Sequence, residues 1–217
     1  PDLTNKFVES FTAAGGRFIG SNEIKGVHWD GLSQVVTTLE NGEEILPQRE
    51  EPYDYLVLAI GSVSNDFGIK GVADNCIFLD SVSQAKTFQR RLVNQFIRLN
   101  RDLAKTTIER KLHVVIVGGG ATGVELSAEL FKARQLFATY GLHNVRPEHL
   151  QVSLIEAGPC LLPALSERIS SAVYTELEEL GVNVNLSTMI TCAEKGALIT
   201  KDGTRFDADL IVWAAGV

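Results

Sequence analysis

A run of six residues, Gly118-Gly119-Gly120-Ala121-Thr122-Gly123, has the residue types and spacing to bind a phosphate group. The run follows the pattern G-x-G-x-x-G and lies between a strand-like segment and a helix-like one, the context that this pattern requires. Gly118 permits a tight turn, Gly120 lets backbone N–H groups approach a pyrophosphate, and Gly123 allows close helix–strand packing. The N-terminus of the following helix supplies partial positive charge. The motif predicts dinucleotide binding; the alternative is a turn that only packs a helix on a strand.

A carboxylate at the end of the next predicted strand, Glu156, is a second candidate for the site. It can accept hydrogen bonds from ribose hydroxyls and would repel a 2′-phosphate, so it favours NAD over NADP; Ala157 follows it in the same loop. The spacing from Gly118 exceeds the usual value of about 20 residues, and an apparent insertion at 134–149 accounts for the excess. The alternative is a solvated acid at a strand end.

Three further positions are candidates on local grounds. Glu125 follows Gly123 in the first turn of the helix, where it could orient a nicotinamide for hydride transfer, although the helix dipole alone favours an acid there. Gly61 and Gly216 close apolar strand-like runs, at the edge where open α/β sheets bind ligands. A plain strand-to-loop turn explains both glycines equally well.

The elements around these residues alternate between strand and helix patterns, as in βαβ units. We expect strands at 112–117, 150–156, 182–186 and 209–214, helices at 121–138 and 166–180 with Gly181 as the C-terminal cap, and an antiparallel meander at 190–206. The fold class predicted for this part is α/β, a Rossmann-like domain whose parallel sheet has at least three strands.

The N-terminal part of the chain has strand and turn patterns and lacks the alternation of strands and helices. Residues 16–46 alternate short β-prone runs, including 17–20, with the hairpin signals Asp30-Gly31 and Asn41-Gly42, which predicts a small antiparallel meander. The continuous apolar run at 55–60 predicts a strand buried on both faces. We therefore expect a meander and a buried strand over 1–80, and a nucleotide-binding domain over 111–217.

A long amphipathic helix is expected to connect these parts over 81–110, with Ser81 or Ser83 as its N-cap. Between Lys86 and Lys111 the chain carries eight Lys and Arg against Asp102 and Glu109. This pattern is typical of a solvated basic face on a helix packed against its own domain; the alternative is a helix that binds a membrane surface or a partner.

Composition limits the function classes. The 217 residues are 45% hydrophobic and 22% charged, as in soluble globular proteins, and the net charge of −7 disfavours nucleic acid as a partner. Three widely spaced cysteines indicate neither a disulfide framework nor a metal site, and no apolar run is long enough to predict a membrane span. Because the chain stops directly after a strand-like run, we expect a piece of a longer protein.

Three segments, at 53–62, 65–72 and 115–130, resemble type II NADH dehydrogenases. The Asn65-Asp66-Phe67-Gly68 stretch and the insertion at 134–149 are more specific to that family than the glycine motif. The resemblance implies a flavoprotein that transfers a hydride from NADH to FAD and then electrons to a membrane quinone. It also implies a peripheral protein on the cytoplasmic side of a respiratory membrane, attached through segments outside this chain, with a homodimer as one assembly that the family allows.

Carried over by residue, the resemblance assigns roles to four parts of the sequence. The NADH pyrophosphate would lie at 118–123, the adenosine ribose at Glu156 and Ala157, and the nicotinamide near Glu125, Ala215 and Gly216. FAD would face Ala59, Gly61 and Ser62. Two other functions stay open: a soluble NADH-dependent flavoprotein reductase or oxidase, and a non-catalytic dinucleotide-binding regulatory module.

Overall fold

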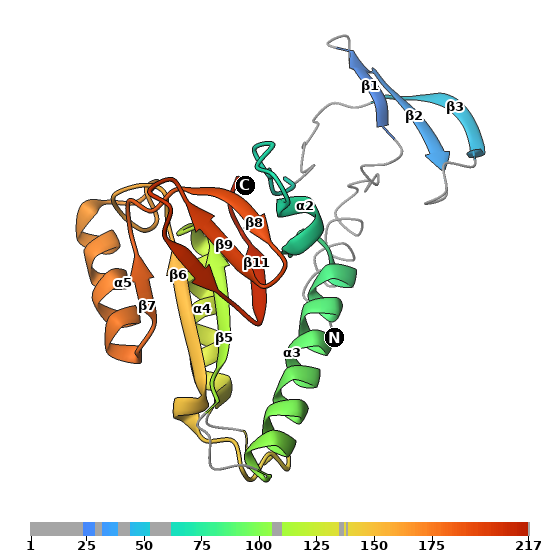
Figure 1. The fold of residues 1–217 in the computed structure, drawn as a ribbon. Helices are drawn as coiled ribbons and strands as arrows, with labels where there is room; N and C mark the ends of the chain where they lie inside the picture. The colour runs from blue at the N-terminus through green and yellow to red at the C-terminus, as the bar shows by residue number, and fades with distance from the viewer. Residues whose placement is uncertain are drawn as a thin grey trace. The chain divides into compact units, whose positions relative to one another are not determined.

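A computed structural model of the chain describes residues 62–105, 110–134, 137 and 139–216, together with the backbone of three strands nearer the N-terminus (Figure 1). The chain divides into two compact units, Pro1–Gly61 and Ser62–Val217. The predicted strand runs at 17–20 and 55–60, and the site residues Ala59 and Gly61, lie outside the described residues.

The N-terminal unit contains a three-stranded antiparallel sheet in the order β1-β2-β3. Its strands are β1 Ile24–His28, β2 Leu32–Thr38 and β3 Glu44–Pro52. The Asp30-Gly31 and Asn41-Gly42 signals fall between paired strands in the sequence, so the predicted meander is confirmed for these strands. β3 runs beyond the predicted end at 46, because its pairing with β2 continues to Pro52.

The C-terminal unit is built on a parallel sheet of five strands in the order β4-β11-β5-β6-β7. Its strands are β4 Ile77–Phe78, β5 Leu112–Val117, β6 Leu150–Ile155, β7 Asn183–Asn185 and β11 Leu210–Trp213. The predicted α/β class and parallel core are confirmed. β5 and β6 pair in register from Leu112↔Leu150 to Val117↔Ile155, so their carboxyl ends meet at one edge.

Both faces of this sheet are covered, which explains the continuous apolar runs of its strands. Val114 and Ile116 face a core shared with the helices α3 Val82–Leu103, α4 Ala121–Ala133 and α5 Glu167–Leu180. Val115 and Val117 face a second core. That core is closed by an antiparallel sheet, β8 Ile190–Glu194, β9 Ala197–Thr200 and β10 Arg205–Asp207, which lies across the other face (Figure 1).

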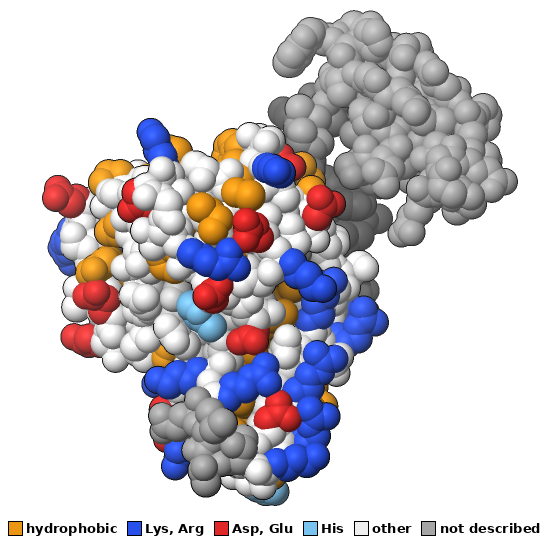
Figure 2. Space-filling model, viewed as in Figure 1, with side chains coloured by type: hydrophobic (Ala, Val, Ile, Leu, Met, Phe, Trp, Pro, Cys, Tyr) orange, Lys and Arg blue, Asp and Glu red, His pale blue; other side chains and the backbone are white. Residues whose placement is uncertain are grey.

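The long helix α3 begins after Ser81, whose Oγ accepts a hydrogen bond from Gln84 N at 3.2 Å, so the predicted N-cap is confirmed. Its buried side chains Phe88, Phe96 and Leu99 belong to the core on the helical face of the sheet. This packing agrees with the interpretation of a helix held against its own domain. Figure 2 shows Lys and Arg side chains gathered along the outer side of α3.

The structure differs from the sequence predictions at the end of α4. α4 ends at Ala133 rather than near 138, and part of the apparent insertion after it packs back on the core: the rings of Phe96 and Phe137 lie 4.6 Å apart between centroids, and Val145 is buried. Within the compact unit Ser62–Val217, β4 pairs with the parallel sheet that carries the glycine turn, and α3 packs on the same sheet. None of the helices in the described part combines the length and apolar character needed to cross a bilayer.

Candidate functional site

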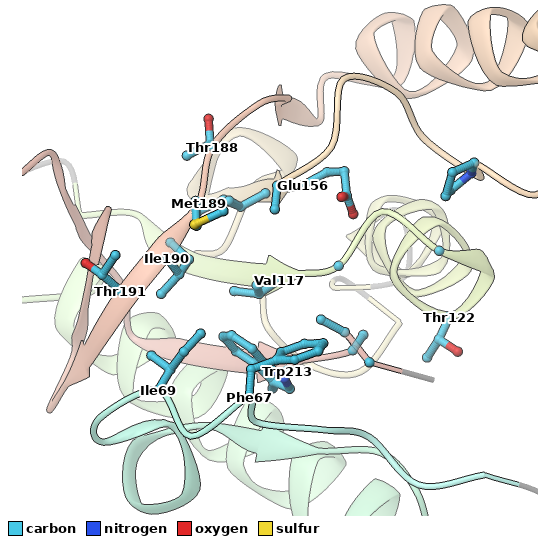
Figure 3. A pocket seen from close by; sticks show the side chains of 18 of the residues that line it. Phe67, Ile69, Val117, Thr122, Glu156, Thr188, Met189, Ile190, Thr191 and Trp213 are labelled. Carbon is cyan, nitrogen blue, oxygen red and sulfur yellow. The ribbon is translucent and has the colours of Figure 1, made fainter. Parts of the chain in front are cut away.

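A cavity of about 1050 Å³ opens in the C-terminal unit at the carboxyl edge of the parallel sheet (Figure 3). The ends of β5, β6 and β11, the first turn of α4 and two further segments, 67–70 and 188–191, provide its walls. Parallel strands end at the same edge of a sheet, and this edge is where such folds bind ligands. The volume is at the upper end of the range for small-molecule sites.

The glycines of the motif have different structural reasons to be glycine. Gly118 has φ +115, and a Cβ on it would lie 2.6 Å from the backbone oxygen of Ala214. A Cβ on Gly123 would overlap the backbone oxygen of Gly118, so this glycine sets the close approach of α4 to the turn. Gly120 lines the cavity, and a Cβ there would meet no atom within 4 Å. The space beside Gly120 is therefore open to a ligand.

Backbone donors lie at the start of α4, next to this open space. The first hydrogen bond of α4 near the turn runs from Val124 N to Gly120 O at 3.1 Å, so the N–H groups of Ala121, Thr122 and Gly123 have no acceptor within the helix. Ala121 and Thr122 also line the cavity. Free N–H groups and the positive end of the helix dipole together attract an anion, which agrees with the phosphate site predicted from the glycine pattern.

Glu156, half-buried at the end of β6, connects the glycine turn to the loop after its own strand. Its Oε2 accepts a hydrogen bond from Gly119 N, and its Oε1 accepts one from Gly158 N, both at 2.6 Å. A carboxylate has about four acceptor positions, so two such bonds leave capacity for the hydroxyls of a ligand. The bonds also fix the orientation of the carboxylate at the cavity wall.

The structure brings most of the predicted site residues together and leaves a few apart. Glu125 is exposed on α4 and does not line the cavity, and Ser62 is exposed outside it. Gly119 and Gly123 shape the turn without lining the cavity. The predicted residues that line the cavity are Gly118, Gly120, Ala121, Thr122, Glu156, Ala157, Ala215 and Gly216.

Several lining residues were not identified as site residues from the sequence. They are Phe67, Gly68, Ile69, Lys70, Val117, Ile155, Pro163, Thr188, Met189, Ile190, Thr191, Trp213 and Ala214. The segment around Phe67 carried a signal, because Asn65–Gly68 is part of the family resemblance. The segment at 188–191 carried no ligand-binding signal: residues 188–189 precede β8, and Ile190 and Thr191 are its first residues, which the sequence indicated only as part of the meander at 190–206. Lys70 and Glu156 are the charged side chains among the lining residues.

Outside the cavity lining, burial shifts the pKa values of Cys76 and His113. Burial raises the pKa of the Cys76 thiol to about 12, which makes it a poor nucleophile. His113 contacts Ser153 Oγ through Nε2 at 2.9 Å, and burial lowers the pKa of its imidazole. Within the described residues, no group of three His, Cys, Asp or Glu side chains could hold a metal ion.

The strand order, the glycine turn at the start of α4 and the cavity beside it define a Rossmann-type α/β domain. Comparison with known proteins refines this class. The chain belongs to the pyridine nucleotide-disulphide oxidoreductase family, whose family model matches residues 14–217.

Three relatives illustrate the likeness. A type II NADH:quinone oxidoreductase from Haemophilus influenzae is 52% identical over 189 residues, covering 82% of this chain and 43% of that protein. One from Staphylococcus aureus is 33% identical over 188 residues, covering 84% of this chain and 46% of its own length. NDH2 from Plasmodium falciparum, solved in complex with NADH, superposes with a TM-score of 0.64 at 23% identity, over 89% of this chain and 40% of that one.

The likeness to type II NADH dehydrogenases expected from the sequence is confirmed by these relatives. The chain spans less than half the length of each of them. The solved structure supports the fold of the described part.

Proposed function

We propose that this chain is the NADH-binding part of an FAD-dependent NADH dehydrogenase that passes electrons to a membrane quinone. The observation that carries the proposal is the open space at Gly120, which adjoins the start of α4, where N–H groups lack a helical acceptor, in a cavity that Glu156 also lines. The named activity of the relatives supports the electron acceptor.

In the proposed complex the protein supplies position and electrostatics. The N–H groups at the start of α4 hold the pyrophosphate, and Glu156 accepts hydrogen bonds from the adenosine ribose hydroxyls. The negative charge of Glu156 disfavours a 2′-phosphate, so NADH is the preferred dinucleotide over NADPH. Nicotinamide and flavin supply the hydride and electron chemistry when bound.

The remaining assignments extend the same proposal. The nicotinamide lies towards Ala215 and Gly216, which line the cavity at the end of β11. Glu125, which is exposed just past the first turn of α4, acts on the geometry of hydride transfer, and FAD faces Ala59, Gly61 and Ser62. Of these FAD residues, Ser62 lies in the described part of the chain, where it is exposed.

For the longer protein we propose the arrangement expected from the family: a peripheral homodimer on the cytoplasmic side of a respiratory membrane. Size-exclusion chromatography with light scattering tests the dimer. Protease accessibility of inverted and right-side-out membrane vesicles tests the side of attachment.

The experiment that tests the function has two steps. Isothermal titration calorimetry of the chain with NADH and NADPH measures binding, and absence of NADH binding would refute the assigned site. The second step follows flavin bleaching by NADH in the full-length protein under anaerobic conditions, then reoxidation by a quinone. Reoxidation by oxygen alone would favour a soluble oxidase, and binding without bleaching would favour a regulatory module.

A further inference from the structure

The short turn that precedes α2 (Val72–Asn75) holds an aromatic residue in an unusual backbone conformation. Phe67 has φ +52, in the left-handed region that bulky side chains rarely adopt. Two polar side chains stabilise the turn: Asn65 Oδ1 accepts a hydrogen bond from Phe67 N at 2.7 Å, and Asp66 Oδ1 accepts one from Gly68 N at 2.9 Å. The conformation is therefore built into the local sequence.

The turn is also fixed to the carboxyl end of β11. Trp213 Nε1 donates a hydrogen bond to Asn65 O at 2.8 Å. A Cβ on Gly216 would lie 2.6 Å from Asn65 Cβ, so the turn and the end of β11 are in close contact. The turn that carries Phe67 is consequently held against the end of β11 by two independent contacts of Asn65.

This fixed conformation leaves the ring of Phe67 unburied. The residue is 61% exposed although it lines the cavity, and it lies on the wall across from Glu156 (Figure 3). An exposed aromatic ring in a strained backbone contributes little to the core. Strain of this kind persists where the surrounding structure imposes it, and it is concentrated at ligand sites.

We infer that Phe67 is a stacking platform for the nicotinamide half of the bound dinucleotide. The inference rests on the proposed function. If the pyrophosphate lies at Gly120 and the adenosine ribose at Glu156, the wall across the cavity receives the other ring system. The phenyl ring of Phe67 offers a flat apolar surface to that ring. Phe67 is thus a positioning residue, since it orients the ring without taking part in the hydride transfer.

The test compares two ligands on the purified chain by isothermal titration calorimetry. In the Phe67→Asn variant, affinity for NADH is expected to fall about tenfold, the effect of losing one aromatic stacking contact. Affinity for ADP-ribose, which lacks the nicotinamide, should change less than twofold. Phe67→Tyr keeps the ring and should bind NADH as the unmodified chain does.

Two controls separate binding from folding. Asn tolerates the left-handed conformation, so the Tm of Phe67→Asn is expected to stay within about 2 °C. Tyr140→Asn removes another exposed aromatic ring, 73% exposed and outside the cavity lining, and should leave NADH affinity unchanged. If Phe67→Asn fails to fold, Phe67→Leu replaces it, and a threefold loss of NADH affinity is then expected.

Two results would overturn the inference while leaving the proposed function intact: NADH affinity within twofold of the unmodified chain, or an equal loss for ADP-ribose. If the unmodified chain binds no NADH, the proposed function and this inference fail together. A loss of NADH affinity in Phe67→Asn or Phe67→Leu, with none in Phe67→Tyr, supports the role of Phe67 as a stacking platform.

Discussion

Replacing Gly120 by Val should abolish dinucleotide binding and leave the fold intact. The backbone at Gly120 has φ −74, which any residue adopts, and a Cβ there meets no atom within 4 Å. The cost to the folded chain is limited to a poorer N-cap for α4, about 0.5–1 kcal/mol. The side chain would, however, fill the space that the pyrophosphate needs.

The loss of affinity follows from the donors that the ligand could no longer reach. Hydrogen bonds to a charged group contribute about 1.5–3 kcal/mol each. Losing the bonds from the N–H groups of Ala121 and Thr122, which line the cavity, would therefore cost about 3–6 kcal/mol, a rise in Kd of roughly 10² to 10⁴. Isothermal titration calorimetry with NADH measures this change, and a thermal unfolding curve of the same sample checks the fold.

A second glycine of the motif provides the matched comparison. A Cβ on Gly123 would overlap Gly118 O, so Gly123→Ala should lower the free energy of unfolding by about 1–3 kcal/mol. Gly120→Val is thus expected to raise the Kd for NADH with little change in stability. Gly123→Ala is expected to lower the stability of the fold. A Kd for NADH within threefold of the unmodified chain in Gly120→Val would show that the pyrophosphate does not lie against the turn.

Three other predictions follow from the described geometry. Because the carboxylate of Glu156 lines the cavity, NADH should bind at least tenfold more tightly than NADPH, and equal Kd values in a titration would contradict the ribose assignment. Burial lowers the pKa of His113, so as pH falls below 6.5 the unfolded chain takes up this proton before the folded chain does, and the free energy of unfolding should decrease. In His113→Gln, the free energy of unfolding measured with urea should depend less steeply on pH between pH 5 and 8. With its pKa raised to about 12, the Cys76 thiol should stay unmodified by a disulfide reagent at pH 8 while Cys160 and Cys192, which are partly exposed, react; rapid modification of Cys76 in the folded chain would contradict its burial.

The sequence was most informative where pattern and local chemistry agree. The start of α4 after Gly120 and the N-cap at Ser81 follow from the local sequence alone, and the structure has both. β4, of only two residues, was not predicted, because a strand that short has no periodicity and forms through pairing with β11, far along the chain.

The site was predicted in part for the same physical reason. Gly118 was identified from the glycine pattern that follows a strand, and Glu156 from its place at the end of the next strand. Phe67 and Met189 reach the same cavity from loops, and their approach depends on tertiary packing that the local sequence does not encode. The bonds from Gly119 and Gly158 to Glu156 likewise join segments whose contact only the fold establishes.

The two hydrogen bonds that Glu156 accepts from Gly119 N and Gly158 N affect how the cofactor preference of this chain could be redesigned. A single substitution is often chosen to convert an NAD-dependent domain to NADP, with the strand-end acid replaced by a neutral or basic residue. Here the carboxylate of Glu156 accepts a hydrogen bond from Gly119 N at 2.6 Å, so its removal would loosen the glycine turn as well as alter the proposed ribose site. If Glu156 sets the cofactor preference as proposed, the residue that selects the dinucleotide also holds the glycine turn, and changing the preference would require another acceptor for the Gly119 N–H group.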